Sequence, residues 1–348
     1  MIKPSPQYWK EKTVLVTGGA SFIGSHLVDE LVGLGADVTV VDNLSSGKFE
    51  NLAFSRDKIR FSQFDLEYSH LRELLPVFRD NSVVFHLAAT HGGRGFIGGH
   101  PADVCSNFSI DHHVLEASCG ANVEKVVFAS SACVYPPRLQ DPGSRYLLRE
   151  EDSDLTSLEN YLSADLEYGW AKLMGEMQLR AFIKQYGLRG CCMRFVTAYG
   201  PRENESHAIA ALIYKAFQRA DPYVIWGTGD QERDFTYVSD IVAGIVTAAE
   251  KIEDGTAINL GTGQRHKVNE VANQIFQLFG WRPRNIIYDN TMPTGVASRA
   301  LDIRRARELL AWEPKTSFDD GLAKTIEWYT DTHSYEGRVN DLLLTECA

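Results

Sequence analysis

Tyr168 and Lys172 lie four residues apart in a segment with a helical pattern, Tyr-Gly-Trp-Ala-Lys. Side chains at this spacing project from the same face of a helix. A neighbouring ammonium favours the phenolate, so we expect the pKa of Tyr168 to lie below its usual value. Such a tyrosine can take a proton from a hydroxyl whose carbon gives up a hydride. Ser131, at the end of a predicted strand, is placed to hydrogen-bond the same hydroxyl.

A glycine turn, Gly18 to Gly24, follows the first predicted strand and leads into a predicted helix. Such a turn lets the backbone approach a pyrophosphate, which then sits at the positive end of the helix. Asp42 ends the second predicted strand, where an acidic group can accept hydrogen bonds from an adenosine ribose and repel a 2'-phosphate. NAD is therefore favoured over NADP. Asp65 and Leu66, after the third strand, are placed to meet the adenine.

Short apolar strands alternate with longer amphipathic segments through the first two thirds of the chain. The predicted strands cover residues 13–17, 36–42, 58–64, 82–88, 124–131, 190–196 and 257–261, and helical patterns cover 23–34, 110–119, 268–279 and 319–329. This alternation predicts an α/β fold, a Rossmann-type doubly wound parallel sheet with a smaller C-terminal α/β lobe for a substrate.

Two lobes are expected from this pattern and from the length of 348 residues. We assign residues 1–196 and about 234–265 to the dinucleotide-binding domain, and about 197–233 with 266–330 to the substrate lobe. Residues 331–348 are expected to form a loose tail.

The net charge of -11 disfavours binding to nucleic acid or to an anionic membrane surface. The chain has no apolar run long enough to span a bilayer, and its start, MIKPSPQYWKEK, has no signal-peptide pattern, so we expect a cytoplasmic protein. The six cysteines, Cys347 among them, form no C-x-x-C pair and are expected to be reduced. The adjacent pairs at 112–113 and 191–192 diverge, so no metal site is expected.

Taken together, the glycine turn, Asp42, Ser131 and the Tyr168/Lys172 pair resemble the extended short-chain dehydrogenase/reductase family, in particular its nucleotide-sugar epimerases and dehydratases. Further similar segments are HLAA (86–89), SSACVYP (130–136), YGPR (199–202), the run from WGTG to the Asp at 240, and NLGTG (259–263). The resemblance covers roughly residues 12–330. It implies an NAD-dependent enzyme acting on a nucleoside-diphosphate sugar.

Site residues follow from the motifs and the resemblance. The cofactor-binding residues are expected to be Gly18, Ala20, Ser21, Phe22, Ile23, Gly24, Asp42, Asn43, Asp65, Leu66, Leu87, Ala88, Ala89, Asn107, Tyr168 and Lys172. The resemblance also implies a homodimer that packs through helices near 108–118 and 168–185.

Within the family, SSACVYP is most similar to the segment of GDP-mannose 3,5-epimerases and GDP-fucose synthases in which a cysteine is an acid/base. Here that residue is Cys133, and His207 stands where those enzymes carry the partner acid, just before an apolar helix. Two proton carriers on opposite faces of a 4-keto sugar are what inversion at C3 or C5 requires, because the ketone acidifies the neighbouring C–H bonds.

Substrate contacts are expected from two further regions. The loop Thr90 to Phe96 resembles the glycine-rich loop of the 3,5-epimerases, in which Gly93 and Gly95 would let the backbone approach a sugar and Arg94 would reach an oxygen. Arg233 and Arg299 match family positions that bind the diphosphate.

The sequence thus favours an NAD-dependent epimerase similar to GDP-mannose 3,5-epimerase, with Tyr168, Lys172, Ser131, Cys133 and His207 as catalytic residues. A UDP-glucose/UDP-galactose type 4-epimerase is an alternative, because it needs no Cys/His pair. An epimerase/reductase similar to GDP-fucose synthase fits the pair, but Asp42 disfavours the NADPH that it consumes. A 4,6-dehydratase is disfavoured by Ala132-Cys133, where those enzymes carry Asp-Glu. An inactive NAD-sensing protein is disfavoured by the intact Ser131/Tyr168/Lys172 set.

Overall fold

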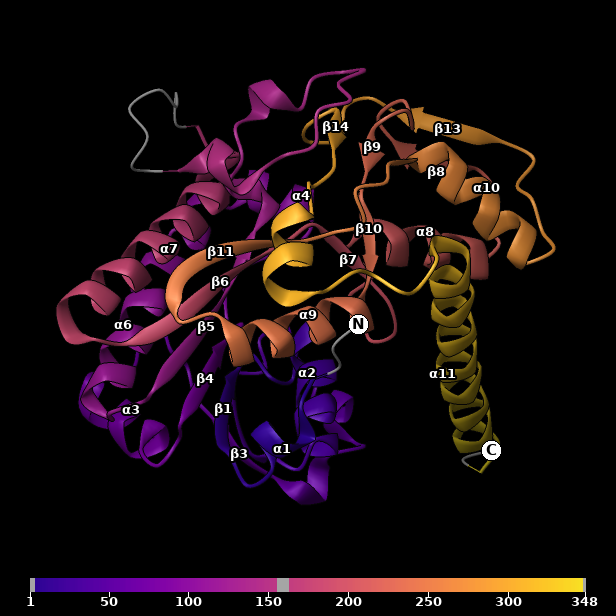
Figure 1. The fold of residues 1–348 in the computed structure, drawn as a ribbon. Helices are drawn as coiled ribbons and strands as arrows, with labels where there is room; N and C mark the ends of the chain where they lie inside the picture. Colours follow the sequence, from indigo (N-terminus) through magenta and orange to yellow (C-terminus); the bar gives the residue numbers. More distant parts are fainter. Residues whose placement is uncertain (1–3, 155–162, 347–348) are drawn as a thin grey trace.

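The computed structural model describes residues 4–154 and 163–346, with side chains of the last helix described to position 334, so Cys347 lies outside the described residues. A parallel seven-stranded sheet forms the centre of the molecule, in the order β11-β6-β5-β4-β1-β2-β3 (Figure 1). The strands are β1 (Thr13–Thr17), β2 (Asp37–Asp42), β3 (Ile59–Gln63), β4 (Val83–His86), β5 (Lys125–Ser131), β6 (Arg189–Phe195) and β11 (Asp254–Leu260). Each of the seven predicted strands is confirmed.

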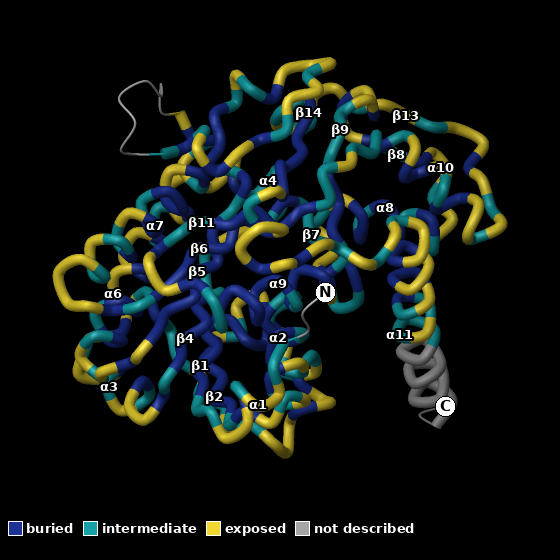
Figure 2. Tube along the Cα trace, in the orientation of Figure 1, coloured by how far each residue is buried: buried dark blue, intermediate teal, exposed yellow. Residues whose placement is uncertain are grey.

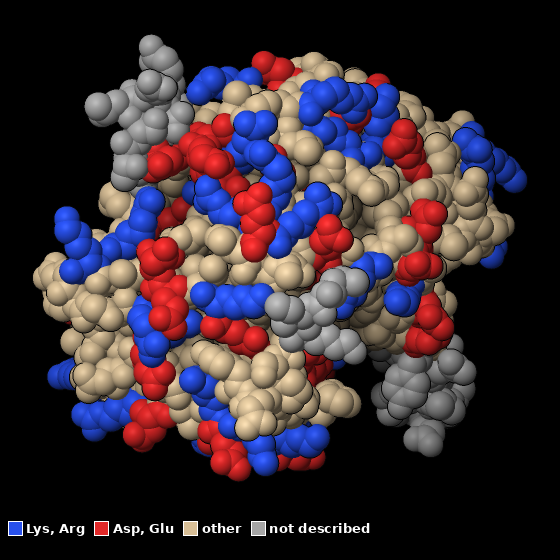
Figure 3. Space-filling view, viewed as in Figure 1, with Lys and Arg blue, Asp and Glu red and all other residues tan. Residues whose placement is uncertain are grey.

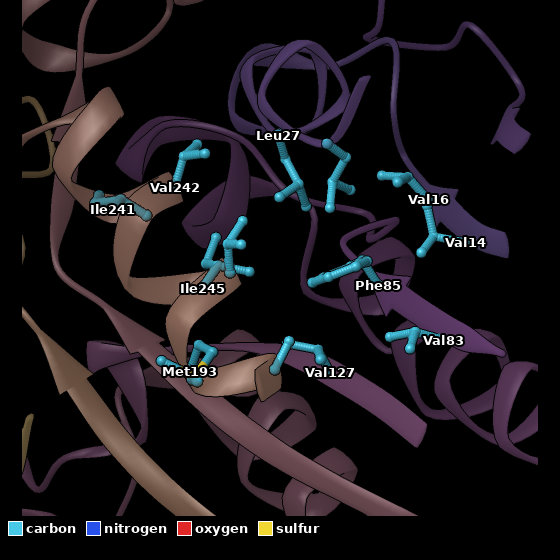
Figure 4. Packing of buried hydrophobic residues seen from close by; sticks show 14 of the residues in the cluster. Val14, Val16, Leu27, Val83, Phe85, Val127, Met193, Ile241, Val242 and Ile245 are labelled. Atoms are coloured by element: carbon cyan, nitrogen blue, oxygen red, sulfur yellow. The ribbon is translucent and has the colours of Figure 1, made fainter. Parts of the chain in front are cut away.

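Helices cover both faces of this sheet. One face carries α2 (Phe22–Gly33) and α9 (Val238–Lys251), and the other carries α3 (Leu71–Phe78), α6 (Asn107–Gly120) and α7 (Leu166–Tyr186). Successive strand residues point to opposite faces, so Val14 and Val16 of β1 pack under α2 and α9 while Leu15 joins the opposite core. Figure 4 shows this packing around Ile245 of α9. The predicted Rossmann-type doubly wound fold is confirmed.

Burial follows the layers. The central strands form the dark core of the tube in Figure 2, and exposed residues lie on the outer surfaces of the helices. Because the strands of a parallel sheet are buried on both faces, they read as nearly continuous apolar runs. Because the strands run parallel, their carboxyl ends lie at the same edge of the sheet, where a ligand of such a sheet binds.

The smaller lobe combines short strands with three helices. Its strands are β7 (Thr197–Tyr199), β8 (Tyr223–Trp226), β9 (Glu232–Arg233), β10 (Phe235–Tyr237), β12 (His266–Lys267), β13 (Ile286–Asp289) and β14 (Ser298–Arg299), and its helices are α8 (Ala208–Phe217), α10 (Val268–Leu278) and α11 (Phe318–Glu346). They share a separate core around Ile213, Tyr223, Ile275 and Leu322. Short helices elsewhere are α1 (Pro6–Trp9), α4 (Arg94–Gly99) and α5 (Pro101–Val104).

Helix α11 continues through Asp331, where the tail was expected to begin, and it extends away from the smaller lobe (Figure 1). On this helix the rings of Tyr329 and His333 stack on each other, with their centroids 3.9 Å apart. The first residues assigned to the tail are therefore helical, and the proposed domain boundaries stay a prediction.

Acidic and basic side chains are interspersed on the face shown in Figure 3. Among the described residues, no helix has the length and apolar character needed to cross a membrane, and no cluster of His, Cys, Asp and Glu side chains could hold a metal ion.

Candidate active site

The glycine turn after β1 is built for close backbone contacts. Gly18 has φ +68°, and a Cβ there would lie 2.7 Å from the backbone nitrogen of Ala88. A Cβ at Gly24, in the first turn of α2, would lie 2.1 Å from the carbonyl oxygen of Gly18. The turn can therefore keep its shape only with glycine at both positions, and it presents the start of α2 to a phosphate.

Asp42 lies beside this turn at the end of β2. Its two carboxylate oxygens accept the N–H groups of Ala20, at 2.9 Å, and Leu44, at 2.8 Å. Burial raises the pKa of Asp42, and these two hydrogen bonds oppose that rise. A carboxylate has about four acceptor positions, so two N–H groups leave capacity for a ribose diol. The carboxyl end of β2 thus fits the adenosine side of a dinucleotide.

Most of the expected cofactor residues line one pocket above the sheet. Those lining it are Gly18, Ser21, Asp42, Asn43, Asp65, Leu66, Leu87, Ala88 and Ala89, while Phe22 and Ile23 line the adjoining cleft. Asn43 donates to the Asp65 carboxylate at 3.0 Å, so the two β-strand ends are tied together. This set has the acceptors and glycine turn that NAD requires.

Three expected cofactor residues have structural roles and do not line either pocket. Ala20 and Gly24 shape the turn, as described above. Asn107 is fully buried, and its side chain accepts from the Thr90 N–H and donates to the Thr90 and Val104 carbonyls. Asn107 therefore fixes the loop after β4, because its amide is already saturated by protein groups.

The predicted redox residues come together where the carboxyl end of β5 meets the first turns of α7. Tyr168 and Lys172 share one face of α7, with the Lys172 Nζ 6.0 Å from the Tyr168 ring centroid. Ser131 ends β5 and makes a hydrogen bond with Tyr168. All three side chains line the same cleft, which supports the arrangement expected from the sequence.

The electrostatics of Tyr168 differ from the expectation. Burial raises the pKa of Tyr168 above its usual value, the charges of Cys133 and Asp111 raise it further, and the hydrogen bond from Ser131 opposes the rise. The expectation that the pKa of Tyr168 lies below its usual value was wrong, because desolvation by burial dominates. The positive charge of an oxidised nicotinamide would favour the phenolate.

A larger cleft, with a volume of about 720 Å³, joins the cofactor pocket to the smaller lobe. This size falls within the usual range for small-molecule sites. The expected catalytic and substrate residues that line it are Tyr168, Lys172, Ser131, Cys133, His207, Gly93, Arg94, Arg233 and Arg299. Residues from both lobes therefore meet in one site.

Cys133 lies in a small network of charged groups. The Arg299 guanidinium donates to Cys133 Sγ at 3.3 Å, to Asp165 at 2.7 Å and to Gln140 at 2.5 Å. The second oxygen of Asp165 accepts from Arg94 at 2.8 Å. Burial alone would raise the pKa of Asp165, but these two arginines lower it. Arg299 lines the cleft, and each of its guanidinium nitrogens is engaged by a protein group beside the thiol.

His207 precedes α8 and has a buried carboxylate behind it. Its Nδ1 lies 3.4 Å from Glu203 Oε1, and the other Glu203 oxygen is buried with no hydrogen-bond partner among the described residues. Burial raises the pKa of Glu203, and the hydrogen bond to His207 opposes that rise. On the cleft side, the His91 ring lies 6.0 Å from the His207 ring. This geometry orients the His207 imidazole.

The loop after β4 uses its glycines differently from the expectation. A Cβ at Gly93 would lie 2.3 Å from the Ser206 carbonyl oxygen, and one at Gly95 would lie 3.5 Å from the Trp226 ring. Gly93 therefore allows close approach of the segment before His207, so the loop and His207 are held together.

Arg233 also lines the cleft. Its guanidinium donates to the backbone carbonyls of Glu232 and Thr294, and neither of these hydrogen bonds involves a carboxylate.

Sequence reasoning missed Glu203, Asp165 and the buried acid Asp111. Glu203 lies four residues before His207, a spacing that could have drawn attention to it. Asp165 directly precedes α7, where an aspartate also has an ordinary capping interpretation. Asp165 and Asp111 contact residues of other elements, Arg94 and His86, so their roles required the fold.

Comparison with known proteins identifies the family. Residues 14–261 match the NAD dependent epimerase/dehydratase family. The chain belongs to this family. It is 32% identical over 319 residues to a putative UDP-glucose 4-epimerase of Methanocaldococcus jannaschii, covering 90% of this chain and 97% of that protein.

Solved structures agree. The UDP-glucose 4-epimerase of Thermotoga maritima, crystallised with UDP-glucose, matches with a TM-score of 0.82 and 31% identity, covering 92% of this chain and 99% of that one. MoeE5, solved with UDP-glucuronic acid and NAD, matches with a TM-score of 0.78 and 33% identity over the same shares of the two chains. The protein is therefore an NAD-dependent enzyme of the nucleotide-sugar epimerase type. Two of these relatives are named as UDP-glucose 4-epimerases and the third was solved with a UDP-sugar, whereas the Cys/His motif resembles that of the GDP-mannose 3,5-epimerases.

Proposed function

We propose that this enzyme inverts C3, C5 or both in a nucleoside-diphosphate sugar after transient oxidation at C4. The observation that carries the proposal is that Cys133 and the His207–Glu203 pair line the same cleft as Tyr168. Inversion at C4 alone requires no proton carriers beyond the redox tyrosine. Two further groups able to carry a proton therefore favour chemistry at the carbons next to a C4 ketone.

Tyr168 is the proposed base that takes the C4 hydroxyl proton, and Ser131 hydrogen-bonds the same oxygen. NAD, when bound, would supply the reversible acceptor for the C4 hydride. Lys172 holds a positive charge beside the phenol. Since the hydride and the hydroxyl proton both return to the sugar, the overall reaction is an isomerisation with no net redox change.

Cys133 and His207 are the proposed carriers for the C–H protons. Once C4 is a ketone, one carrier removes the proton from the neighbouring carbon and the other delivers a proton to the opposite face. Glu203 orients the His207 imidazole, and Arg299 fixes the position of the thiol. Arg233 and Arg299 are the proposed ligands of the diphosphate, whose negative charge the acidic protein must bind locally.

A 4-epimerase acting on a UDP-sugar is the second candidate, because two of the relatives named above carry the name UDP-glucose 4-epimerase, one of them as putative. In that reaction the 4-keto sugar rotates in the cleft, so that the hydride returns to its opposite face. The cleft volume of about 720 Å³ gives room for such a rotation. Cys133 would then contact the sugar without carrying a proton.

The test is NMR of products formed in heavy water from GDP-mannose and, separately, from UDP-glucose. Deuterium at C3 or C5 of the product supports the first proposal, and C4 inversion without deuterium supports the second. Tyr168→Phe should abolish both outcomes, because both pass through oxidation at C4. Product formation by that variant at the wild-type rate would contradict the shared redox step.

We also propose that the enzyme works in the cytoplasm as a homodimer. Phe108 of α6, with Trp170 and Met177 of α7, exposes apolar surface on the two helices expected at the interface. Light scattering should give twice the chain mass, and a concentration-independent monomer would contradict the proposal.

A further inference from the structure

A buried polar chain runs beneath the redox pair, outside the residues assigned to catalysis. Thr17 Oγ1 lies 2.8 Å from His86 Nδ1, and His86 Nε2 lies 3.0 Å from Asp111 Oδ1. All three side chains are fully buried. The chain links β1, β4 and α6, so it crosses the sheet just below the carboxyl edge where the site lies.

The hydrogen bonds fix the protonation of this chain. An ionised carboxylate can only accept, so His86 Nε2 must carry the proton that bonds to Asp111, and His86 Nδ1 accepts from the Thr17 hydroxyl. Burial lowers the pKa of His86, although Asp111 opposes that effect. His86 therefore holds Asp111 Oδ1 by a donated hydrogen bond, while Thr17 fixes the other side of the imidazole.

One oxygen of Asp111 is left without a hydrogen bond. Asp111 Oδ2 is buried and has no partner among the described residues. It faces α7, because a Cβ built on Gly175 would lie 2.5 Å from Asp111 Oδ2 and 2.3 Å from the Phe128 ring. A buried carboxylate oxygen with no partner is costly unless a nearby positive charge compensates for it.

Lys172 supplies that charge from the same helix, three residues before Gly175. Its ammonium lies 4.9 Å from the centroid of the Phe128 ring, and the side chain is almost completely buried. Burial lowers the pKa of Lys172, and the charge of Asp111 opposes this effect. The titratable groups facing this region are Asp111 on α6, His86 on β4, His91 after β4 and Tyr168 on α7 itself.

We propose that Asp111, held in place by His86 and Thr17, is a positioning residue that keeps the Lys172 ammonium charged beside Tyr168. A buried ammonium without this counter-charge would lose its proton in the alkaline range. It would then no longer favour the tyrosine phenolate. The inference rests on the proposed redox role of Tyr168 and Lys172, and it is independent of whether C3, C4 or C5 is inverted.

The first test is a double-mutant cycle on unfolding, which requires no substrate. Asp111→Asn and Lys172→Met are each expected to lower the urea midpoint, because each leaves a buried charge uncompensated. Asp111→Asn/Lys172→Met should recover part of that loss. Losses that simply add in the double variant would overturn the proposal. Ser118→Ala, which removes a buried hydroxyl elsewhere on α6 and no charge, is the control for packing of that helix.

The second test is the pH dependence of NADH formation on the enzyme, followed by absorbance after adding UDP-glucose or GDP-mannose. Asp111 raises the pKa of both Tyr168 and Lys172. Asp111→Asn should therefore move both limbs of the rate profile toward acid, by about 1 pH unit. A profile unchanged in position, with only its height reduced, would show a structural role and overturn the proposal. If Tyr168→Phe proves fully active, the redox assignment itself fails, while the unfolding cycle still tests the Asp111–Lys172 pair.

Discussion

The carboxylate of Asp42 accepts the Ala20 N–H at 2.9 Å and so joins the end of β2 to the glycine turn after β1. One side chain thus stabilises the phosphate-binding turn and lies where an adenosine ribose would bind. The choice of NAD is consequently tied to the shape of the turn, because the same charge that accepts the ribose hydroxyls repels a 2'-phosphate.

Asp42→Ser should weaken NAD binding about 10- to 100-fold, as expected for loss of hydrogen bonds to a charged group. The discrimination against NADP should fall by more than the affinity for NAD, because the repulsive charge is gone. Titration calorimetry with both nucleotides measures this. Asp65→Asn serves as the comparison, and an NAD/NADP ratio no more altered by Asp42→Ser than by Asp65→Asn would contradict the assignment.

Gly24→Ala should abolish NAD binding, because its Cβ would lie 2.1 Å from the Gly18 carbonyl oxygen and the turn would have to open. Gly33→Ala on the same helix is a matched control, since a Cβ there has no neighbour within 4 Å. Intrinsic fluorescence on NAD addition reports binding by each variant. Equal NAD affinity in the two variants would be inconsistent with a rigid turn.

The strands and the glycine turn could be predicted because their signals are local. A run such as Thr13–Thr17 followed by Gly18 specifies both a buried strand and a turn that only glycine tolerates. The functions of Asn107 and Gly93 could not be predicted in the same way. Asn107 contacts Thr90 across a loop, and Gly93 meets the Ser206 carbonyl from the other lobe.

Glu203→Gln should slow the reaction about 10- to 100-fold with a smaller change in KM, because the imidazole of His207 loses its orienting charge. Steady-state kinetics with the reactive sugar nucleotide gives the two parameters. Glu205→Gln is the comparison, since Glu205 instead contacts Tyr329 and His333 of α11. Equal effects of the two substitutions on kcat would argue against a specific role for Glu203.

Acid should destabilise the fold between about pH 7 and pH 5. Burial lowers the pKa of His26 to about 4, and the charge of Arg202 adds to this effect. Below the usual histidine pKa of about 6.5, the unfolded chain therefore binds more protons at position 26 than the folded chain does. This contribution to stability is present above that pH and is lost as the pH falls.

The loss attributable to His26 is about 2 kcal/mol between those two pH values. His26→Gln, which can still donate to the Pro201 carbonyl, should flatten the dependence measured by urea unfolding at pH 7 and pH 5. The same slope in wild type and variant would assign the acid sensitivity to other groups, such as the buried His86.

Prediction of the catalytic centre from sequence was limited by electrostatics. The Tyr168/Lys172 spacing correctly places both residues on one face of α7, but the pKa of Tyr168 depends on burial and on Cys133 and Asp111, which come from other elements. Asp111 lies four residues after Asn107 in a helix and has no motif of its own. Its importance depends on the unpaired oxygen, which only the packing against α7 reveals.

The most direct test of the central claim is solvent exchange by Cys133→Ala and His207→Gln beside the wild type, in heavy water, with the sugar nucleotide that reacts. We predict deuterium at C3 or C5 with the wild type, and a loss of about 100-fold or more in that exchange with each variant. Both variants should still reduce bound NAD, because Tyr168 and Lys172 are intact. A product inverted only at C4, formed without deuterium and at an undiminished rate by both variants, would contradict the claim.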